Sequence, residues 1–119
     1  VGYPYSQAYR DTGNYYDCSS LAYYSWKTAG VDISFGGATT AAAEAQGLDE
    51  AGKSITEAEL QPGDLIFYSY TTNGRYKNIS HVGIYAGNGK MVEAKNEAVG
   101  VVYGDFHNGS VVMYARPNK

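Results

Sequence analysis

The pattern of apolar and polar positions predicts helices in the first half of the chain. Residues 18–29 carry apolar side chains at helical spacing, and Gly30 follows where such a helix would end. Residues 39–47 are rich in alanine, begin with threonine and end with glycine, which predicts a second short helix. The sequence TEAE at residues 56–59 has the spacing of a capping box and predicts a helical turn.

Strand patterns replace the helical ones after Pro62 and Gly63. Apolar, β-branched and aromatic runs separated by turn signals predict strands at residues 64–70, 80–86, 90–94, 100–104 and 110–115. Helices that precede strands in this way predict an α+β fold, with the helices packed on an antiparallel sheet of about five strands. The length of 119 residues suits a single domain over residues 1–119, because it is enough to bury one core.

Composition and charge narrow the possible partners. The formal net charge is −3 and the nine Lys and Arg residues form no run, so no nucleic acid is expected to bind. No apolar stretch approaches the ~20 residues of a membrane-spanning helix, so no membrane insertion is expected. The 13 tyrosines suit either packing on half-buried strands or a surface that handles sugars or peptides. A monomer is the expected state.

The chain's one cysteine, Cys18, stands at the expected start of the first helix. If Asp17 caps that helix, the thiol lies in its first turn, where unpaired backbone N–H groups and the helix dipole favour a thiolate. The same N–H groups could stabilise an oxyanion on a substrate carbonyl. Position alone leaves two interpretations open, a catalytic nucleophile or a buried cysteine that packs as a small apolar residue.

A cysteine nucleophile needs a base, and the chain has two histidines. His107 precedes an Asn-Gly turn and is expected to be exposed. His81 lies in a predicted strand beside Gly83, whose missing side chain is expected to let a helix approach the sheet closely. We therefore predict that His81 is the base. Two isolated histidines and one cysteine make no metal-ligand cluster, so neither a metal nor another cofactor is expected.

A third polar group should fix the orientation of the His81 ring, and the hairpin after His81 offers two candidates. If Asn88 and Gly89 form a two-residue turn, His81 faces Asn96, and Glu93 lies on the opposite face of the sheet. If the loop has three residues or an equivalent bulge, Glu93 becomes a diagonal neighbour of His81 on the same face. We favour the second register and predict Glu93 as the orienting group.

Four motifs, GYPY, YDCSSL, LQPGDLIFY and ISHVGIYAGNGKMVEA, follow one another in a recognisable order and spacing. In these motifs the chain resembles the NlpC-type cysteine peptidases, a papain-like family that cleaves peptidoglycan stem peptides. The resemblance covers residues 2–94 and implies a papain-like fold with the catalytic cysteine at a helix start. It implies that Cys18 is the nucleophile, His81 the base and Glu93 the third polar member of the site.

The resemblance also implies a substrate and a location. Tyr5, Asp17 and Ser80 are expected to contact the stem peptide, in part at its free amino end. The implied reaction is hydrolysis of the amide between γ-D-glutamate and the following diamino acid, through an acyl-enzyme. A secreted protein that acts at the cell wall, as one part of a larger multidomain protein, fits this reaction. Ser20 departs from the glycine usual in the family, which bears on the packing of the helix.

Two alternatives stay open, because a Cys–His pair does not specify which bond is cut. The first is an amidase or acyltransferase that uses the same pair on another amide or ester. The second is a non-catalytic cell-wall-binding module. The altered stretch at residues 6–16 and the surplus of tyrosine favour this module.

Overall fold

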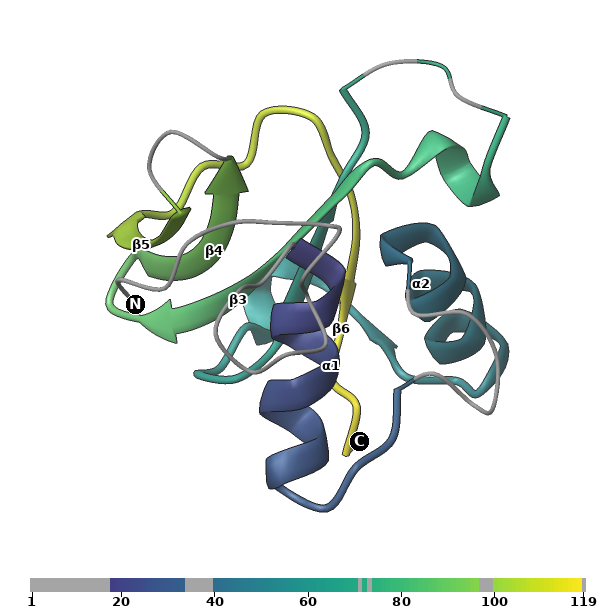
Figure 1. Cartoon of the computed structure of the whole chain (residues 1–119), viewed down its shortest axis with the longest axis horizontal. Coiled ribbons are helices and arrows are strands. Elements are labelled where there is room, and N and C mark those ends of the chain that lie inside the picture. The colour runs from purple at the N-terminus through teal and green to yellow at the C-terminus, as the bar shows by residue number, and fades with distance from the viewer. Residues whose placement is uncertain (1–17, 34–39, 71, 73, 97–99, 119) are drawn as a thin grey trace.

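Two helices and an antiparallel sheet make up the part of the chain that the structure describes (Figure 1). This computed structural model describes residues 18–33, 40–70, 72, 74–96 and 100–118. The helices are α1 (Cys18–Thr28) and α2 (Ala41–Glu50), and the short 3-10 turns are η2 (Glu57–Glu59) and η3 (Tyr76–Asn78). The strands are β1 (Ser54–Ile55), β2 (Leu65–Tyr68), β3 (His81–Gly87), β4 (Lys90–Asn96), β5 (Gly100–Asp105) and β6 (Val111–Ala115). The predicted α+β class is confirmed.

The sheet has six strands in the order β1-β6-β2-β3-β4-β5, and each neighbouring pair is antiparallel. All five predicted strands are present. The sixth, β1, was missed because two residues are too short to show an alternating pattern. It exists through its pairing with β6, where Ser54 lies opposite Ala115 and Ile55 lies opposite Tyr114.

Both helices end at a glycine in the left-handed region. Gly30 has a φ of 88°, and the N–H groups of Gly30 and Val31 donate to carbonyls of the last turn of α1, as predicted. The prediction that α2 stops at Gly47 is wrong, because the helix continues to Glu50 and Gly52, with a φ of 74°, ends it. Leu48, directly after Gly47, is fully buried, so packing outweighs the roughly 1 kcal/mol that an internal glycine costs.

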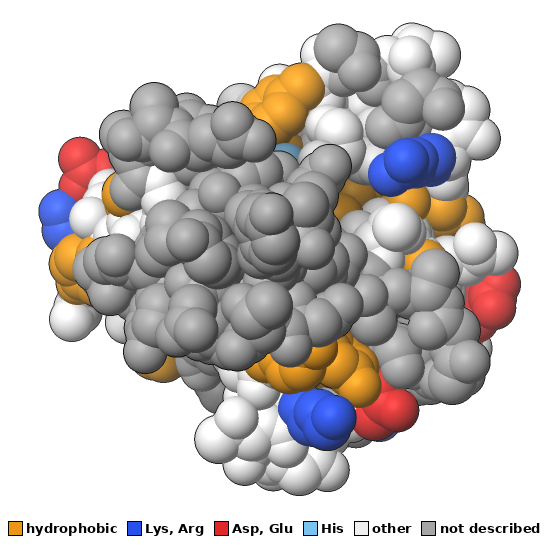
Figure 2. All heavy atoms as spheres, in the orientation of Figure 1, with side chains coloured by type: hydrophobic (Ala, Val, Ile, Leu, Met, Phe, Trp, Pro, Cys, Tyr) orange, Lys and Arg blue, Asp and Glu red, His pale blue; other side chains and the backbone are white. Residues whose placement is uncertain are grey.

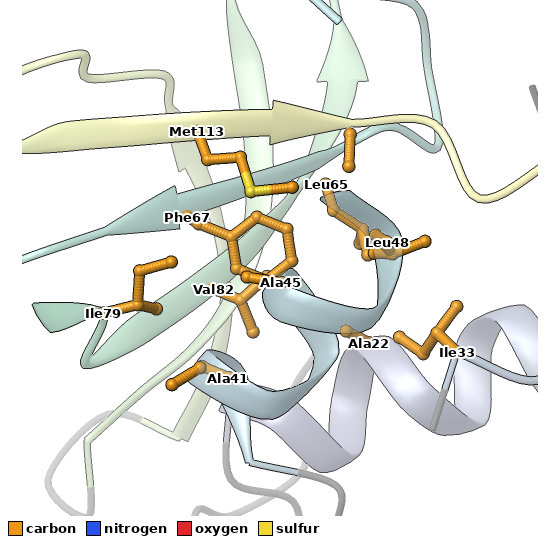
Figure 3. Close-up of a cluster of buried hydrophobic side chains, with 12 residues drawn as sticks. Ala22, Ile33, Ala41, Ala45, Leu48, Leu65, Phe67, Ile79, Val82 and Met113 are labelled. Carbon is orange, nitrogen blue, oxygen red and sulfur yellow. The ribbon is translucent and has the colours of Figure 1, made fainter. Parts of the chain in front are cut away.

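The main core lies between the two helices and one face of the sheet (Figure 3). Phe67 of β2 is central to it, with Val82 of β3 beside it. Ala22 from α1 and Ala45 and Leu48 from α2 close the core from the helical side. All five are at most 1% exposed, so apolar burial at Ala22 holds α1 against the sheet.

Two polar contacts fix the far end of α1 relative to β2. The indole N–H of Trp26 donates to the carbonyl of Gly63 at 3.0 Å. The neighbouring Asp64 is buried and accepts two hydrogen bonds from Arg116 through its two oxygens, each at 3.0 Å. A paired guanidinium and carboxylate of this kind have a defined geometry. The turn before β2 is therefore a rigid support for the helix that begins at Cys18.

The second face of the sheet carries a smaller buried cluster around Ile66, Tyr68 and Met91. Its packing corrects the prediction made for Gly83. A Cβ atom built on Gly83 would lie 2.2 Å from the Cε of Met91 and 3.7 Å from the Cβ of Glu93. The space above Gly83 is therefore filled by side chains of the neighbouring strand and does not serve the approach of a helix.

The turn between β3 and β4 sets the register of the hairpin. Asn88 and Gly89 have φ angles of 54° and 73°, the two positive values that a type I′ turn requires. A bulge between Tyr85 and Gly87 then shifts the register, so that Tyr85 lies opposite Met91. The equivalent bulge considered in the sequence analysis is thus confirmed.

On the face shown in Figure 2, the Lys and Arg side chains of the described residues lie apart from one another. Among the described residues, neither helix has the length and apolar character needed to cross a membrane.

Gly89→Ala is expected to lower the free energy of unfolding by about 1 kcal/mol, because a left-handed backbone is strained in a residue that carries a Cβ atom. Gly104→Ala is the matched control, since Gly104 has no positive φ and both sites have open space for an added Cβ. The control is expected to shift stability by less than about 0.5 kcal/mol. Urea denaturation of the parent and both variants measures the difference, and equal losses would argue against the type I′ turn.

Candidate active site

Cys18 and His81 are the first residues of α1 and β3, and the structure brings these two element starts together. Cys18 is a free, half-buried cysteine, and it lies close enough to His81 for its side chain to raise the pKa of the imidazole. At the start of a helix, free N–H groups and the helix dipole favour negative charge. The thiol therefore lies where a thiolate and an oxyanion next to it are both stabilised. Asp17, the predicted cap, and Tyr5 lie outside the described residues.

Glu93 binds the other side of the His81 ring. Its Oε1 lies 2.9 Å from Nε2 of His81. Both side chains are buried, with 8% of His81 and 6% of Glu93 exposed. With Nε2 taken by the carboxylate, Nδ1 is the ring nitrogen left to face the thiol. The three predicted residues form one chain of contacts, and their catalytic roles stay predictions.

The register of the hairpin explains why Glu93 is the residue that meets His81. The pairing of Ile84 with Val92 places Glu93 next to Gly83, diagonal to His81 on the same face. Without the bulge, the register would shift by one residue and turn Glu93 to the opposite face. The side chain of Asn96, the alternative candidate, is not among those described.

The neighbours of His81 stabilise its charged form. Burial of the imidazole acts to lower its pKa, but hydrogen bonds to Cys18 and Glu93 and the negative charges of both groups outweigh that effect. Together they raise the pKa of His81 to about 9. At neutral pH the ring is therefore an imidazolium that can pair with a thiolate.

Residues 2–115 match the model of the NlpC/P60 family, which is nearly the whole chain. The chain belongs to the NlpC/P60 family. The bifunctional muramidase/DL-endopeptidase CwlT of Bacillus subtilis is 36% identical over 108 residues, which cover 91% of this chain and 29% of that protein. The peptidoglycan DL-endopeptidase CwlO of Bacillus licheniformis is 35% identical over 94 residues, 78% of this chain and 18% of that protein. The chain spans less than a third of either relative.

The solved structures agree with the fold. The crystal structure of an NlpC/P60 family protein from Bacillus cereus matches with a TM-score of 0.78 at 23% identity, over 98% of this chain and 36% of that one. At this identity the likeness concerns the fold alone. The papain-like arrangement, in which helices pack on an antiparallel sheet, is thereby confirmed for this NlpC/P60 chain.

Two tyrosines, Tyr68 at the end of β2 and Tyr70 just after it, lie beside the His81 ring. The rings of Tyr68 and Tyr70 stack at 5.7 Å, and their centres lie 5.6 Å and 6.0 Å from that of His81. Burial and the charge of Glu93 raise the pKa of both phenols, and Cys18 adds to the shift at Tyr70. Tyr68 is fully buried and Tyr70 is 52% exposed, so Tyr70 is the one that an incoming substrate could touch.

His107 was set aside in the sequence analysis, and it belongs to the surroundings of this NlpC/P60 site. Its side chain is 46% exposed, which confirms the predicted exposure, yet its Nε2 lies 3.6 Å from Oε2 of Glu93. Its ring also stacks on Tyr68 with centres 4.7 Å apart. Nothing in the local pattern around Asp105 to Asn108 could reveal this, because the approach depends on how β5 and β6 are placed in the sheet.

Two smaller predictions concern serines. Ser80 is exposed and directly precedes His81, and its hydroxyl accepts a hydrogen bond from the N–H of Tyr70 at 3.3 Å. Its contact with a substrate stays a prediction. Ser20, the departure from the family's usual glycine, is fully buried on α1, so the helix packing accommodates its side chain.

A metal site was not expected, and the described residues contain no group of three or more His, Cys, Asp or Glu side chains placed to hold a metal ion.

The raised pKa of His81 predicts that stability depends on pH. A group whose pKa is about 9 in the folded chain and near 6.5 in the unfolded chain stabilises the fold fully below about pH 6.5. That contribution is lost as the pH rises through about 9. Urea denaturation across this range is expected to show the decline, and NMR titration of the imidazole nitrogens is expected to give the pKa directly.

Glu93→Gln is the control for this titration. It removes the charge and keeps the size of the side chain, so the pKa of His81 is expected to fall and the decline in stability to become smaller. A parent protein in which His81 titrates near its ordinary 6.5 would contradict the electrostatic account.

Proposed function

We propose that this chain is a cysteine peptidase domain that hydrolyses peptidoglycan stem peptides at the amide between γ-D-glutamate and the following diamino acid. The contact chain from Cys18 through His81 to Glu93 carries the proposal. CwlT and CwlO, both similar to this chain, are named DL-endopeptidases. An amide that joins a D-glutamyl residue to an L-configured centre fits that description.

In the first half of the reaction, the Cys18 sulfur attacks the γ-carbonyl carbon of the D-glutamyl residue after its proton has passed to His81. Backbone N–H groups at the start of α1 stabilise the negative oxygen of the tetrahedral intermediate. His81 then gives its proton to the leaving nitrogen, and the C–N bond breaks. A thioester on Cys18 and a free amino group on the diamino acid result.

In the second half, water attacks the thioester while His81 takes one of its protons. The C–S bond breaks, the γ-carboxyl group is released, and the proton returns to the sulfur–imidazole pair. The hydrogen bond from Nε2 to Glu93 keeps the ring in place while its other nitrogen exchanges the proton.

The carboxylate of Glu93 determines the pH range in which the proposed hydrolysis is fast. Because Glu93 supports the charged form, His81 keeps the proton needed by the leaving amine up to about pH 9. Above that pH the ring is neutral and the departure of the amine becomes slow. The rate of hydrolysis is therefore expected to fall on the alkaline side as His81 loses its proton.

The wider setting is part of the same proposal. Tyr5, Asp17 and Ser80 contact the stem peptide, with Ser80 placed on the surface next to His81. Residues 1–119 act as one monomeric catalytic domain that works outside the cytoplasm at the cell wall. A place within a longer multidomain protein is supported by the greater length of CwlT and CwlO.

The test uses soluble muropeptides of defined structure, incubated with the parent, Cys18→Ala and Cys18→Ser and analysed by mass spectrometry. The parent is expected to release a product with a new amino terminus on the diamino acid. Both variants are expected to lose at least about a thousandfold in kcat/KM, because neither supplies a sulfur nucleophile. Cys18→Ser is the closer control, since it keeps the size and a hydrogen-bonding group.

Other products would identify another function. Release of the peptide from the muramyl lactyl group would show an amidase, and an acylated acceptor amine would show a transferase. If the parent leaves the fragments intact but is retained on insoluble peptidoglycan, the chain is a binding module and the hydrolase proposal is wrong.

A further inference from the structure

The carboxylate of Glu93 is approached by two histidines, one at each oxygen. His81 contacts Oε1 at 2.9 Å, and Nε2 of His107 lies 3.6 Å from Oε2. The proposed reaction uses only the first of these contacts. Because Glu93 is 6% exposed, few other groups can reach it from solvent, so the second contact bears directly on how the carboxylate is held.

The segment that carries His107 is fixed in place by its own contacts. The carbonyl of His107 accepts a hydrogen bond from the hydroxyl of buried Tyr68 at 2.8 Å, and the two rings stack. On one side of it, the N–H of Phe106 donates to the carbonyl of Gly89 at 2.8 Å. On the other side, the amide of Asn108 donates to Glu57 at 3.3 Å. The imidazole is therefore presented to Glu93 by an anchored backbone.

The separation of 3.6 Å is that of an ion pair, longer than a hydrogen bond, so the attraction depends on the charge of His107. His107 itself contacts two titratable groups, Tyr68 of β2 and Glu93 of β4, and Glu93 in turn contacts His81 of β3. Glu93 is the acidic group that His107 meets directly.

We propose that His107 is a positioning residue. It holds Oε2 of Glu93 so that Oε1 stays on Nε2 of His81, and a charged His107 ring holds Oε2 more firmly than a neutral one. This inference rests on the proposed function, in which the Glu93–His81 contact keeps the imidazole in place for the sulfur of Cys18. Without His107, the carboxylate loses one of the groups that hold it on His81, and the thiolate–imidazolium pair forms less often.

The test follows the alkylation of Cys18 by iodoacetamide, which needs no substrate. Cys18 is the only cysteine in the chain, so the rate of alkylation reports on that one thiol. His107→Ala is expected to slow alkylation about fivefold. His107→Gln keeps a side-chain N–H donor, and it is expected to restore part of the rate.

A double-mutant cycle separates positioning from a merely structural effect. In the Glu93→Gln background, His107→Ala is expected to cause no further change, because the group that it positions has lost its charge. Val112→Ala is the control, since Val112 is 42% exposed on β6 and is not one of the residues that anchor the His107 segment. It is expected to leave alkylation unchanged. The thermal midpoint of each variant checks the fold.

The proposal is overturned if His107→Ala slows alkylation equally in both backgrounds, or leaves the rate unchanged, or raises it. A higher rate would mean that His107 draws the carboxylate away from His81. On a muropeptide substrate the loss is expected in kcat with KM unchanged. If no muropeptide is turned over by the parent, the proposed hydrolysis fails, and the alkylation cycle still decides the role of His107.

Discussion

The single constraint on which this site depends is the register between β3 and β4. One extra residue in the bulge after Tyr85 decides which face of β4 carries Glu93, and with it whether His81 has a carboxylate or none. The type I′ turn at Asn88 and Gly89 fixes the bulge in place. An electrostatic property of one histidine, its pKa, is thus determined by backbone dihedral angles several residues away.

A second support comes from the helix. Apolar burial of α1 against Phe67 and Val82 gives the helix its position, and Trp26 and the turn at Gly63 fix its far end. The start of α1 then brings the Cys18 sulfur to the imidazole. The positions of Cys18 and His81 therefore do not depend only on their contact with each other. A helix that packs on the core and a strand within the sheet each present one group, so the contact is preorganised before a substrate binds.

Local signals in the sequence predicted most of this fold. The start of α1 at Cys18, its end at Gly30, the five longer strands and the capping box at Glu59 all follow from patterns within a few residues. The glycine signal failed at Gly47 because burial of Leu48 outweighed it. What could not be predicted are contacts between distant segments. The filling of the space at Gly83 by Met91 and the approach of His107 to Glu93 depend on tertiary packing.

Tyr68 links the buried side of the sheet to this site through one hydroxyl group. That oxygen donates to the carbonyl of His107 and lies 3.4 Å from the sulfur of Met91, while the ring supports the imidazole of His107. A chain that replaced Tyr68 with phenylalanine would keep the packing and lose the tie to the loop between β5 and β6. The position of the His107 backbone therefore depends on a hydroxyl group that projects from the interior of the sheet.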